Sequence, residues 1–435
     1  MPATHLWLKN SSLLAKTPLR RQALRLVEVV LEAISTSTAI KRVARVSGQN
    51  LSLAGQTYDL KNFRRVVLVA IGKCALSAAT ELEQILGSFL SGGIVLGLEP
   101  APQTEHLFRY FQGDHPKPSE RNIVATAEII AFLKDLRSDD LVIFVISGGG
   151  STLLCQPKHH DLKLEQNLFA ELTKLGATIQ EINTVRKHLS LARGGWLADY
   201  AYPAQAVTLI FSDVPGNDPG FVASGPTVFD ATTIFHADFI LDKYQLRTRL
   251  KLPAKFLIES PKHEKNFTRT RNVIVVSNQV ALEAVAGEAK ALGLRPVICD
   301  TKLFGEARVI SQTILQVLHH SPPGTVLLYG GETTVKVLGQ GQGGRNQELV
   351  LSALEHLKAD ELILSLATDG HDNGPHGGAL GDARTLAEAK VLGLSISTEL
   401  ADNNSAHFFA QKGDYLKIGP TGANVSDLIF ALKSR

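Results

Sequence analysis

The 435-residue sequence lacks most features of a membrane, secreted or nucleic-acid-binding protein. No apolar run approaches the ~18 residues of a bilayer-spanning helix, which argues against a membrane partner. The three cysteines, Cys74, Cys155 and Cys299, are too scattered for a disulfide framework or a zinc knuckle, which suits a reducing cytoplasm. With 45 basic and 42 acidic residues the net charge is only +3, and no basic stripe interleaved with aromatic residues indicates a nucleic-acid partner.

The N-terminal stretch has no acidic residue before Glu28 but several bases, a pattern that resembles an organelle transit peptide. The other interpretation is a first helix, because apolar residues recur there on one helical face. These residues are Leu24, Val27, Val30, Leu31 and Ile34. We favour the helix, and with it a cytoplasmic protein.

One pattern recurs along the chain and predicts the fold class. A short β-branched run ends in a loop of small and polar residues, and a helical period follows, as in "RRVVLVAIGKCALSAA", "LVIFVISGGGSTLL" and "AVTLIFSDVPGNDPG". Such alternation is typical of α/β layers with a largely parallel sheet. Ligands of these sheets bind beyond the carboxyl ends of the strands, where the loops lie.

The length favours two domains, since one hydrophobic core rarely serves so long a chain. The periodicity is weakest between about Phe229 and Asn272, where the chain is polar and broken by prolines. We therefore predict a first domain over residues 18–245, a junction over 246–272 and a second domain over 273–435. Short segments such as "GGALGD" suggest that the second domain has a mixed sheet.

The segment "SGGGST" follows the apolar run "LVIFVI" and has the composition of an anion-binding loop. Glycines allow backbone N–H groups to point at a phosphate, and the positive end of the next helix adds to the attraction. The Walker spacing and the G-x-S-x-G elbow are both absent. We favour a phosphate cradle over a plain tight turn, with these residues: Ser147, Gly148, Gly149, Gly150 and Ser151.

Two cations stand where they could hold anions. Lys73 in "AIGKCA" follows a buried type of strand, and an ammonium there is costly to bury without an anion. The alternative is a lysine that reaches out to water. Arg186, beside Asn183 and Thr184, could bind a small carboxylate through its fork of donors, or could simply lie at the surface.

Four aspartates occupy loops rich in glycine and proline: Asp213, Asp218, Asp369 and Asp372. Aspartates in turns usually accept hydrogen bonds from nearby backbone N–H groups. Carboxylates beside phosphate-binding loops are also what a magnesium site, or a base that orients a hydroxyl, requires. Both interpretations stay open at this point.

The stretch "GQGQGGRNQELVL" contains a G-x-G-x-x-G pattern at Gly339, Gly341 and Gly344. A dinucleotide on this loop would indicate an NAD(P)-dependent enzyme, and the alternative function that we keep open is a reductase of a small acid such as hydroxypyruvate. The preceding "ETTVKVL" is too polar for a central strand, and Arg345 adds a cation that a pyrophosphate would not need. The motif alone is therefore weak support for that alternative.

Taken in order, eight segments resemble the class II glycerate kinases, the glycerate 2-kinase family with a C-terminal MOFRL domain. The resemblance runs from about Arg20 to the C-terminus. The segments are "GKCA", "GDHPKP", "ISGGGSTLL", "INTVRKHLS", "SDVPGNDPGFVASGPT", "GGETTVKVLGQGQGGRNQE", "ATDGHDNGP" and "GPTGANVSDL". Several independent motifs in one order make the resemblance specific.

The resemblance implies ATP-dependent phosphorylation of D-glycerate at its 2-hydroxyl, with Mg²⁺ or a similar divalent cation. It implies a Rossmann-like N-terminal domain, a smaller mixed α/β C-terminal domain and an active site in the cleft between them. Lys73 and Arg345 match the family's lysine and arginine motifs, and Asp213 lies in its S-D-V motif. "HDNG" departs from the family pattern, which puts the role of the Asp369–Asp372 loop in doubt.

Together these observations predict a kinase whose partners are glycerate and ATP, and leave open whether it is a homodimer. Lys73 and Arg345 would neutralise the transferring phosphoryl group, and Asp213 would orient the hydroxyl. Asp213 and Asp369 are the candidate metal ligands. Further substrate- and phosphate-binding candidates, beside Arg186 and the Ser147–Ser151 loop, are Gly341, Gly343, Gly344 and Asn346.

Overall fold

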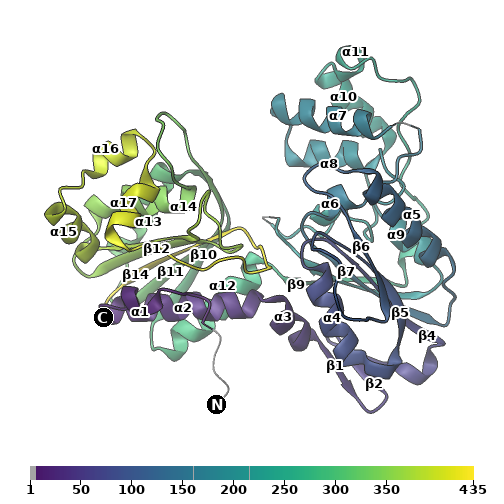
Figure 1. The fold of residues 1–435 in the computed structure, drawn as a ribbon, viewed down its shortest axis with the longest axis horizontal. Helices are drawn as coiled ribbons and strands as arrows, with labels where there is room; N and C mark the ends of the chain where they lie inside the picture. Colours follow the sequence, from purple (N-terminus) through teal and green to yellow (C-terminus); the bar gives the residue numbers. More distant parts are fainter. Residues whose placement is uncertain (1–5, 160, 215) are drawn as a thin grey trace. The chain divides into compact units, whose positions relative to one another are not determined.

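A computed structural model describes residues 6–159, 161–214 and 216–435, and the chain divides into two compact units (Figure 1). The six-stranded unit consists of Ala39–Ser212 and Asn217–Val275. The five-stranded unit consists of Asp213–Gly216, Val276–Arg435 and the N-terminal residues up to Thr38. This confirms the predicted two-domain α/β class.

The sheet of the six-stranded unit has the order β6-β5-β4-β7-β8-β9 and is parallel from β6 to β8. Its central strands are buried along almost their whole length, because helices cover both faces of such a sheet. The strands are β4 (Arg65–Ile71), β5 (Leu90–Gly97), β6 (Phe108–Gln112), β7 (Asp140–Ile146), β8 (Gln205–Phe211) and β9 (Thr270–Val276). A small antiparallel sheet contains β1 (Ala44–Ser47), β2 (Asn50–Leu53) and β3 (Gln56–Asp59).

Side-chain capping boxes mark the start of some helices of this unit. Ser119 and Asn122 form a capping box for α5, and Thr178 and Glu181 form one for α8. The helices are α3 (Thr36–Val43, across the division between the units), α4 (Ala75–Leu86), α5 (Glu120–Lys134), α6 (Gly150–Leu153), α7 (Leu162–Lys174), α8 (Ile179–Lys187), α9 (Trp196–Ala201), α10 (Ile234–Lys243) and α11 (Leu246–Arg249). Short 3-10 turns are η1 (Leu60–Asn62), η2 (Gly87–Phe89), η3 (Val222–Ser224) and η4 (Glu264–Phe267).

The sheet of the five-stranded unit has the order β10-β11-β14-β12-β13. β10 and β11 are parallel and the other pairings are antiparallel, which confirms the predicted mixed sheet. The strands are β10 (Arg295–Glu306), β11 (Thr325–Thr334), β12 (Glu361–Ala367), β13 (Gly378–Asp382) and β14 (Asp427–Lys433).

Helices α13, α14 and α17 pack on this sheet around a shared apolar core (Figure 1). The helices of the unit are α1 (Ser11–Leu14), α2 (Pro18–Ile34), α12 (Asn278–Ala291), α13 (Ala307–His320), α14 (Arg345–Ala353), α15 (Ala383–Val391), α16 (Ile396–Ala401) and α17 (Ser405–Lys412), with the 3-10 turn η5 (Leu354–His356). No helix in the described part of the chain has the length and apolarity that crossing a bilayer requires.

The predicted first helix is confirmed as α2, and its apolar face is buried. We placed residues 18–38 in the first domain, whereas the structure groups them with the five-stranded unit. The physical reason is Arg20, whose fully buried guanidinium binds Asp382 and Asp414. These partners are far away in the sequence, so the periodicity of the helix does not reveal them.

The predicted junction over residues 246–272 also differs from the structure. Helices α7, α8, α10 and α11 form a small helical group of the six-stranded unit (Figure 1). Leu246 and Phe256 are fully buried in its core. Most of the segment is thus part of a packed domain, and the division falls after Val275.

Candidate functional site

Two loops at the carboxyl ends of β4 and β7 are joined by hydrogen bonds. The Lys73 N–H donates to the Gly148 carbonyl at 2.9 Å, and the Cys74 N–H donates to Ser147 Oγ at 3.2 Å. Gly72 has φ +118°, and a Cβ there would collide with Ser147, so only glycine allows this approach. Ser147 therefore joins the loops, and Lys73 has a fixed backbone position beside the glycines.

The glycine loop keeps several backbone donors available. Within the described residues, the N–H groups of Gly148, Gly149 and Ser151 have no acceptor, whereas Gly150 donates to the Ser147 carbonyl at 3.3 Å. Gly149 has φ +82°, a left-handed conformation that turns successive N–H groups toward one side. The arrangement has the donors that an anion-binding loop needs.

The side chains of Lys73 and His115 border this loop. A Cβ on Gly149 would lie 3.5 Å from both Lys73 Cγ and His115 Cδ2, so both side chains border it. Desolvation and the charges of Lys73 and Arg186 lower the pKa of His115. No carboxylate in the described part of the chain pairs with Lys73. The sequence pattern did not indicate a role for His115, which lies in the "GDHPKP" motif.

Arg186 forms no ion pair in the described structure, although the charge of Glu165 acts on it. Its guanidinium carbon lies 3.9 Å from the centroid of the Phe169 ring, and its buried Nε has no hydrogen-bond partner in the described structure. The nearby Glu165 pairs with Arg193 instead, at 2.6 Å. Burial, together with the charge of Arg193, lowers the pKa of Arg186 to about 10. An anionic ligand that binds Arg186 would offset the free-energy cost of burying its charge.

A strained loop supports the same region. Ala223 and Ser224 have φ +51° and +60°, conformations that cost non-glycine residues energy and often mark functional sites. Ser151 Oγ lies 3.0 Å from Ser224 Oγ, which donates to Asn183 Oδ1 at 2.7 Å. Asn183 and the "VASGP" segment thus position the end of the glycine loop, a role that their residue types did not predict.

Arg345 in the five-stranded unit forms ion pairs with two carboxylates. Its Nε and Nη2 bind Asp427 at 2.5 and 3.1 Å, and its Nη1 lies 2.8 Å from Glu332. Burial raises the pKa of Asp427 to about 6, and the bond from Arg345 opposes that rise. Glu332 is half exposed, so a ligand anion could replace it on Arg345.

The loop from Gly339 to Gly344 is covered mainly by the chain itself. Asn403 Oδ1 accepts from the Leu338 and Gly339 N–H groups, and the Asp402 carbonyl accepts from Gly341 at 2.8 Å. The bare backbone therefore accommodates residues 402–405 and not a dinucleotide. The N–H groups of Gly343 and Gly344 have no acceptor in the described structure. Both glycines border a pocket of about 710 Å³ that Arg345 also lines.

The N-terminus of α14 already holds an anion. The Asp372 carboxylate accepts from the Asn346 N–H at 3.0 Å and from the Gln347 N–H at 2.8 Å. A pyrophosphate on a G-x-G-x-x-G loop would need this position, so the geometry does not favour a dinucleotide. Asn346 itself is buried, with its side chain bonded to Asp372 and Ser365.

The remaining aspartates lie in two different settings. Asp218 and Asp369 accept from backbone N–H groups of Gly220 and His371, as turn residues do. Asp213 belongs to the five-stranded unit, where its carbonyl accepts from Ser426 Oγ at 3.2 Å. Ser426 precedes Asp427, so the fold brings the Asp213 segment near the partner of Arg345.

Comparison with known proteins identifies the family to which the chain belongs. The family model described as "Domain of unknown function (DUF4147)" matches residues 22–258, and the MOFRL family matches residues 325–427. The D-glycerate 2-kinase of Thermotoga maritima is 35% identical over 434 residues, covering 95% of this chain and 98% of that protein. An Agrobacterium vitis protein with the provisional name hydroxypyruvate reductase is 37% identical over 384 residues, covering 84% of this chain and 86% of its own.

A solved structure supports the same assignment. The crystal structure of a glycerate kinase from Thermotoga maritima superimposes with a TM-score of 0.85 at 32% identity, covering 95% of this chain and 99% of that one. The likeness thus extends over most of both units. The chain belongs to the glycerate kinase family that combines a DUF4147 domain with a MOFRL domain.

Proposed function

We propose that the protein transfers a phosphoryl group from ATP to the 2-hydroxyl of D-glycerate, giving 2-phosphoglycerate. The observation that carries this proposal is the presence of two cations near the glycine loop, Lys73 and Arg186, neither of which forms an ion pair in the described part of the six-stranded unit. A protein catalyses phosphoryl transfer mainly by positioning the reactants and by stabilising charge on the phosphate oxygens. Lys73, Arg186 and the free N–H groups of the loop supply such stabilisation.

The glycine loop and the two nearby cations would have different roles in phosphoryl transfer. The N–H groups of Gly148, Gly149 and Ser151 would donate to phosphate oxygens and hold them still. Lys73, a compact charge on a flexible stem, would follow the phosphoryl group as it moves. Arg186 would bind a second anionic group, either a further phosphate or the carboxylate of glycerate.

We propose a second set of groups in the five-stranded unit. The N–H groups of Gly343 and Gly344 and the guanidinium of Arg345 border one pocket and would bind another anionic part of the reactants. Asp213 would accept the hydroxyl proton or orient the hydroxyl for attack. Gly341 and Asn346 would act indirectly, since their polar groups are bonded within the protein.

A divalent cation fits this residue set only as a partner of the nucleotide. Magnesium usually keeps several waters and binds through one or two carboxylates together with substrate phosphates. The described residues contain no cluster of three histidine, cysteine or acidic side chains that could hold a metal alone. Asp213, and secondarily Asp369, would supply the carboxylate. When bound, the ion would offset negative charge on the phosphates.

A coupled assay combined with phosphorus NMR tests the proposed reaction. Release of ADP that depends on glycerate, together with a product phosphorylated at its 2-position, is the expected outcome. Oxidation of NADH by hydroxypyruvate without ATP is the control for the reductase alternative. A reductase activity without glycerate-dependent ADP release would refute the kinase.

The variant Asp213→Asn should lower the turnover of glycerate phosphorylation about 10²-fold or more, because an amide cannot accept the hydroxyl proton. Steady-state kinetics across a magnesium titration measures both of its proposed roles. Asp218→Asn is the matched control, since Asp218 closes a turn of the same loop. Full turnover with unchanged magnesium dependence in Asp213→Asn would exclude both roles.

The variant Arg345→Lys should lower turnover on the order of 10²-fold while the protein stays folded, because lysine keeps the charge but loses the fork of donors. Arg308→Lys is the matched control, since Arg308 pairs with Glu348 in the same unit at 2.7 Å. The measurement is kcat beside a thermal unfolding curve. Equal turnover in both variants would remove Arg345 from the reaction.

A further inference from the structure

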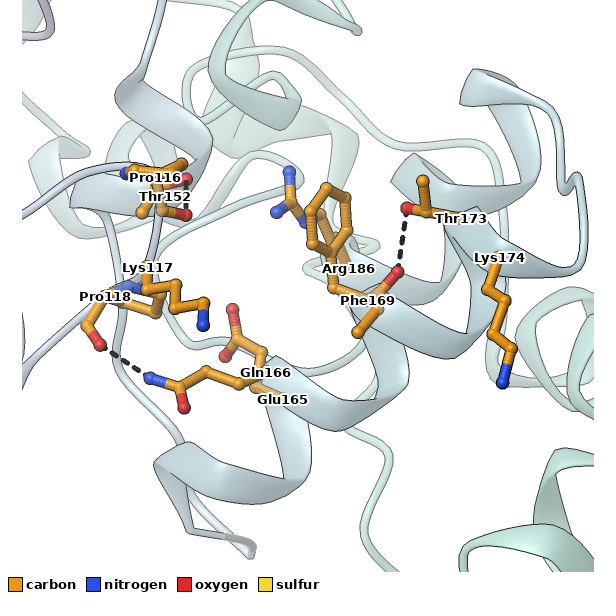
Figure 2. A pocket seen from close by; sticks show the side chains of 11 residues that line it. Pro116, Lys117, Pro118, Thr152, Glu165, Gln166, Phe169, Thr173, Lys174 and Arg186 are labelled. Atoms are coloured by element: carbon orange, nitrogen blue, oxygen red, sulfur yellow. Dashed lines mark hydrogen bonds between the residues drawn. The ribbon is translucent and has the colours of Figure 1, made fainter.

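A cavity of about 390 Å³ lies in the six-stranded unit between helix α7 and the segment Pro116–Pro118 (Figure 2). Apolar surface dominates its walls, with Pro116 and Pro118 on one side and Phe169 and Ala170 on the other. Sites for small organic ligands typically have this size and this composition. Glycerate alone, a small polar acid, would not need such walls.

The cavity is lined by residues that directly follow the anion-binding loop and His115 in the chain. Thr152, which lines the cavity, directly follows Ser151 of that loop, and its hydroxyl lies 3.5 Å from the Pro116 carbonyl. His115, which borders Gly149, directly precedes Pro116. A ligand in the cavity could therefore reach the donors of the loop with an attached anionic group.

Arg186 links the two regions. It lines the cavity, stacks on Phe169 and has a buried Nε without a hydrogen-bond partner in the described structure (Figure 2). Glu165 pairs with Arg193 and acts on Arg186 only through its charge, so Arg186 has no ion pair of its own in the described structure and could bind an anionic ligand. The ligand that fits has a flat, apolar part beside an anionic part.

We infer that this cavity receives the base and sugar of the nucleotide, with Arg186 on the phosphate nearest to them. The inference rests on the proposed function, because it takes ATP as the donor. Gln166 donates its Nε2 to the Pro118 carbonyl at 2.9 Å, which leaves its side-chain oxygen to accept from an amine on the base. The phosphates would then extend from Arg186 to Gly148, Gly149 and Lys73.

Blocking the cavity at its exposed wall tests the inference. Ala170→Trp should weaken ATP binding at least tenfold, because the indole would occupy the space of the base. Binding of inorganic tripolyphosphate, which has no base or sugar, should stay within twofold. Asn167→Trp is the matched control, since Asn167 is an exposed residue of the same helix that does not line the cavity. Calorimetric titration of each protein, with an unfolding curve, gives these values without requiring turnover.

The outcomes of these experiments test nucleotide binding in the cavity separately from the proposed reaction. Loss of ATP affinity with intact tripolyphosphate binding supports the inference, and competition between adenosine and ATP for the wild-type protein supports it independently of any variant. Unchanged ATP affinity in Ala170→Trp, equal weakening of both ligands, or no competition by adenosine overturns it. A wild-type protein that binds ATP but does not phosphorylate glycerate refutes the proposed function, while the titrations still decide the cavity.

Discussion

Replacing Lys73 with alanine should lower kcat for glycerate phosphorylation on the order of 10²-fold or more. The ammonium is the compact cation beside the glycine loop, and no carboxylate in the described structure neutralises it. A side chain that contacts the transferring group mainly in the transition state changes kcat more than KM. Steady-state kinetics with ATP and glycerate varied in turn measures both constants.

The fold should tolerate this change, because Lys73 is exposed and its backbone bonds do not involve the side chain. Lys163→Ala is the control, since Lys163 is an exposed lysine of α7 in the same unit. Near-normal kcat in Lys73→Ala would remove this residue from the mechanism. A large rise in KM for ATP at constant kcat would reassign it to ground-state binding.

Replacing Arg20 with leucine should destabilise the five-stranded unit by about 3–5 kcal/mol, because two buried carboxylates would lose their cation. The guanidinium binds Asp382 at 2.7 Å and Asp414 at 2.8 Å and is fully buried. Trp7, whose Nε1 donates to Glu32 of α2, reports on this helix by fluorescence. A Trp196→Phe background makes that signal specific, since the chain has only 2 tryptophans.

Urea denaturation followed through Trp7 gives the free energy of unfolding of each variant. Arg25→Leu is the control, since Arg25 pairs with Glu288 at the surface, where ion pairs contribute ~0–1 kcal/mol. A loss below about 1 kcal/mol in Arg20→Leu would show that the buried ion pairs do not anchor the helix.

The effect of Arg20→Leu should depend on pH in a defined direction. Burial by itself would raise the pKa of Asp382, but the hydrogen bond and charge of Arg20 lower it below its usual value. A carboxylate with a lowered folded pKa stabilises the protein above its unfolded pKa of about 4, and the contribution is lost as the pH falls through the folded pKa. The stability difference between wild type and variant should therefore shrink below about pH 4.

Local sequence patterns predicted the strands and helices whose burial produces a regular spacing of apolar residues. The apolar runs that became β4 and β7, and the face of α2 from Leu24 to Ile34, were readable because burial imposes a period on the chain. The proximity of Lys73 to the glycine loop was predictable in outline, since adjacent parallel strands end at the same edge.

Contacts between distant segments were not readable. Arg20 meets Asp382 across 362 positions, so nothing near the helix indicated that it belongs to the second half of the chain. The loop from Gly339 to Gly344 has the composition of a phosphate loop, yet residues 402–405 occupy most of its backbone. His115 follows no period, and only the fold places it beside Gly149.

We expect the phosphates of ATP to bind at the glycine-rich, positively charged edge of the six-stranded unit. A crystal structure with a non-hydrolysable ATP analogue, magnesium and glycerate tests it directly. The triphosphate oxygens should lie within hydrogen-bond distance of the N–H groups of Gly148, Gly149 and Ser151, with Lys73 beside them. A triphosphate bound along Gly339 and Gly341 instead, with Lys73 and Arg186 contacting only water, would contradict it.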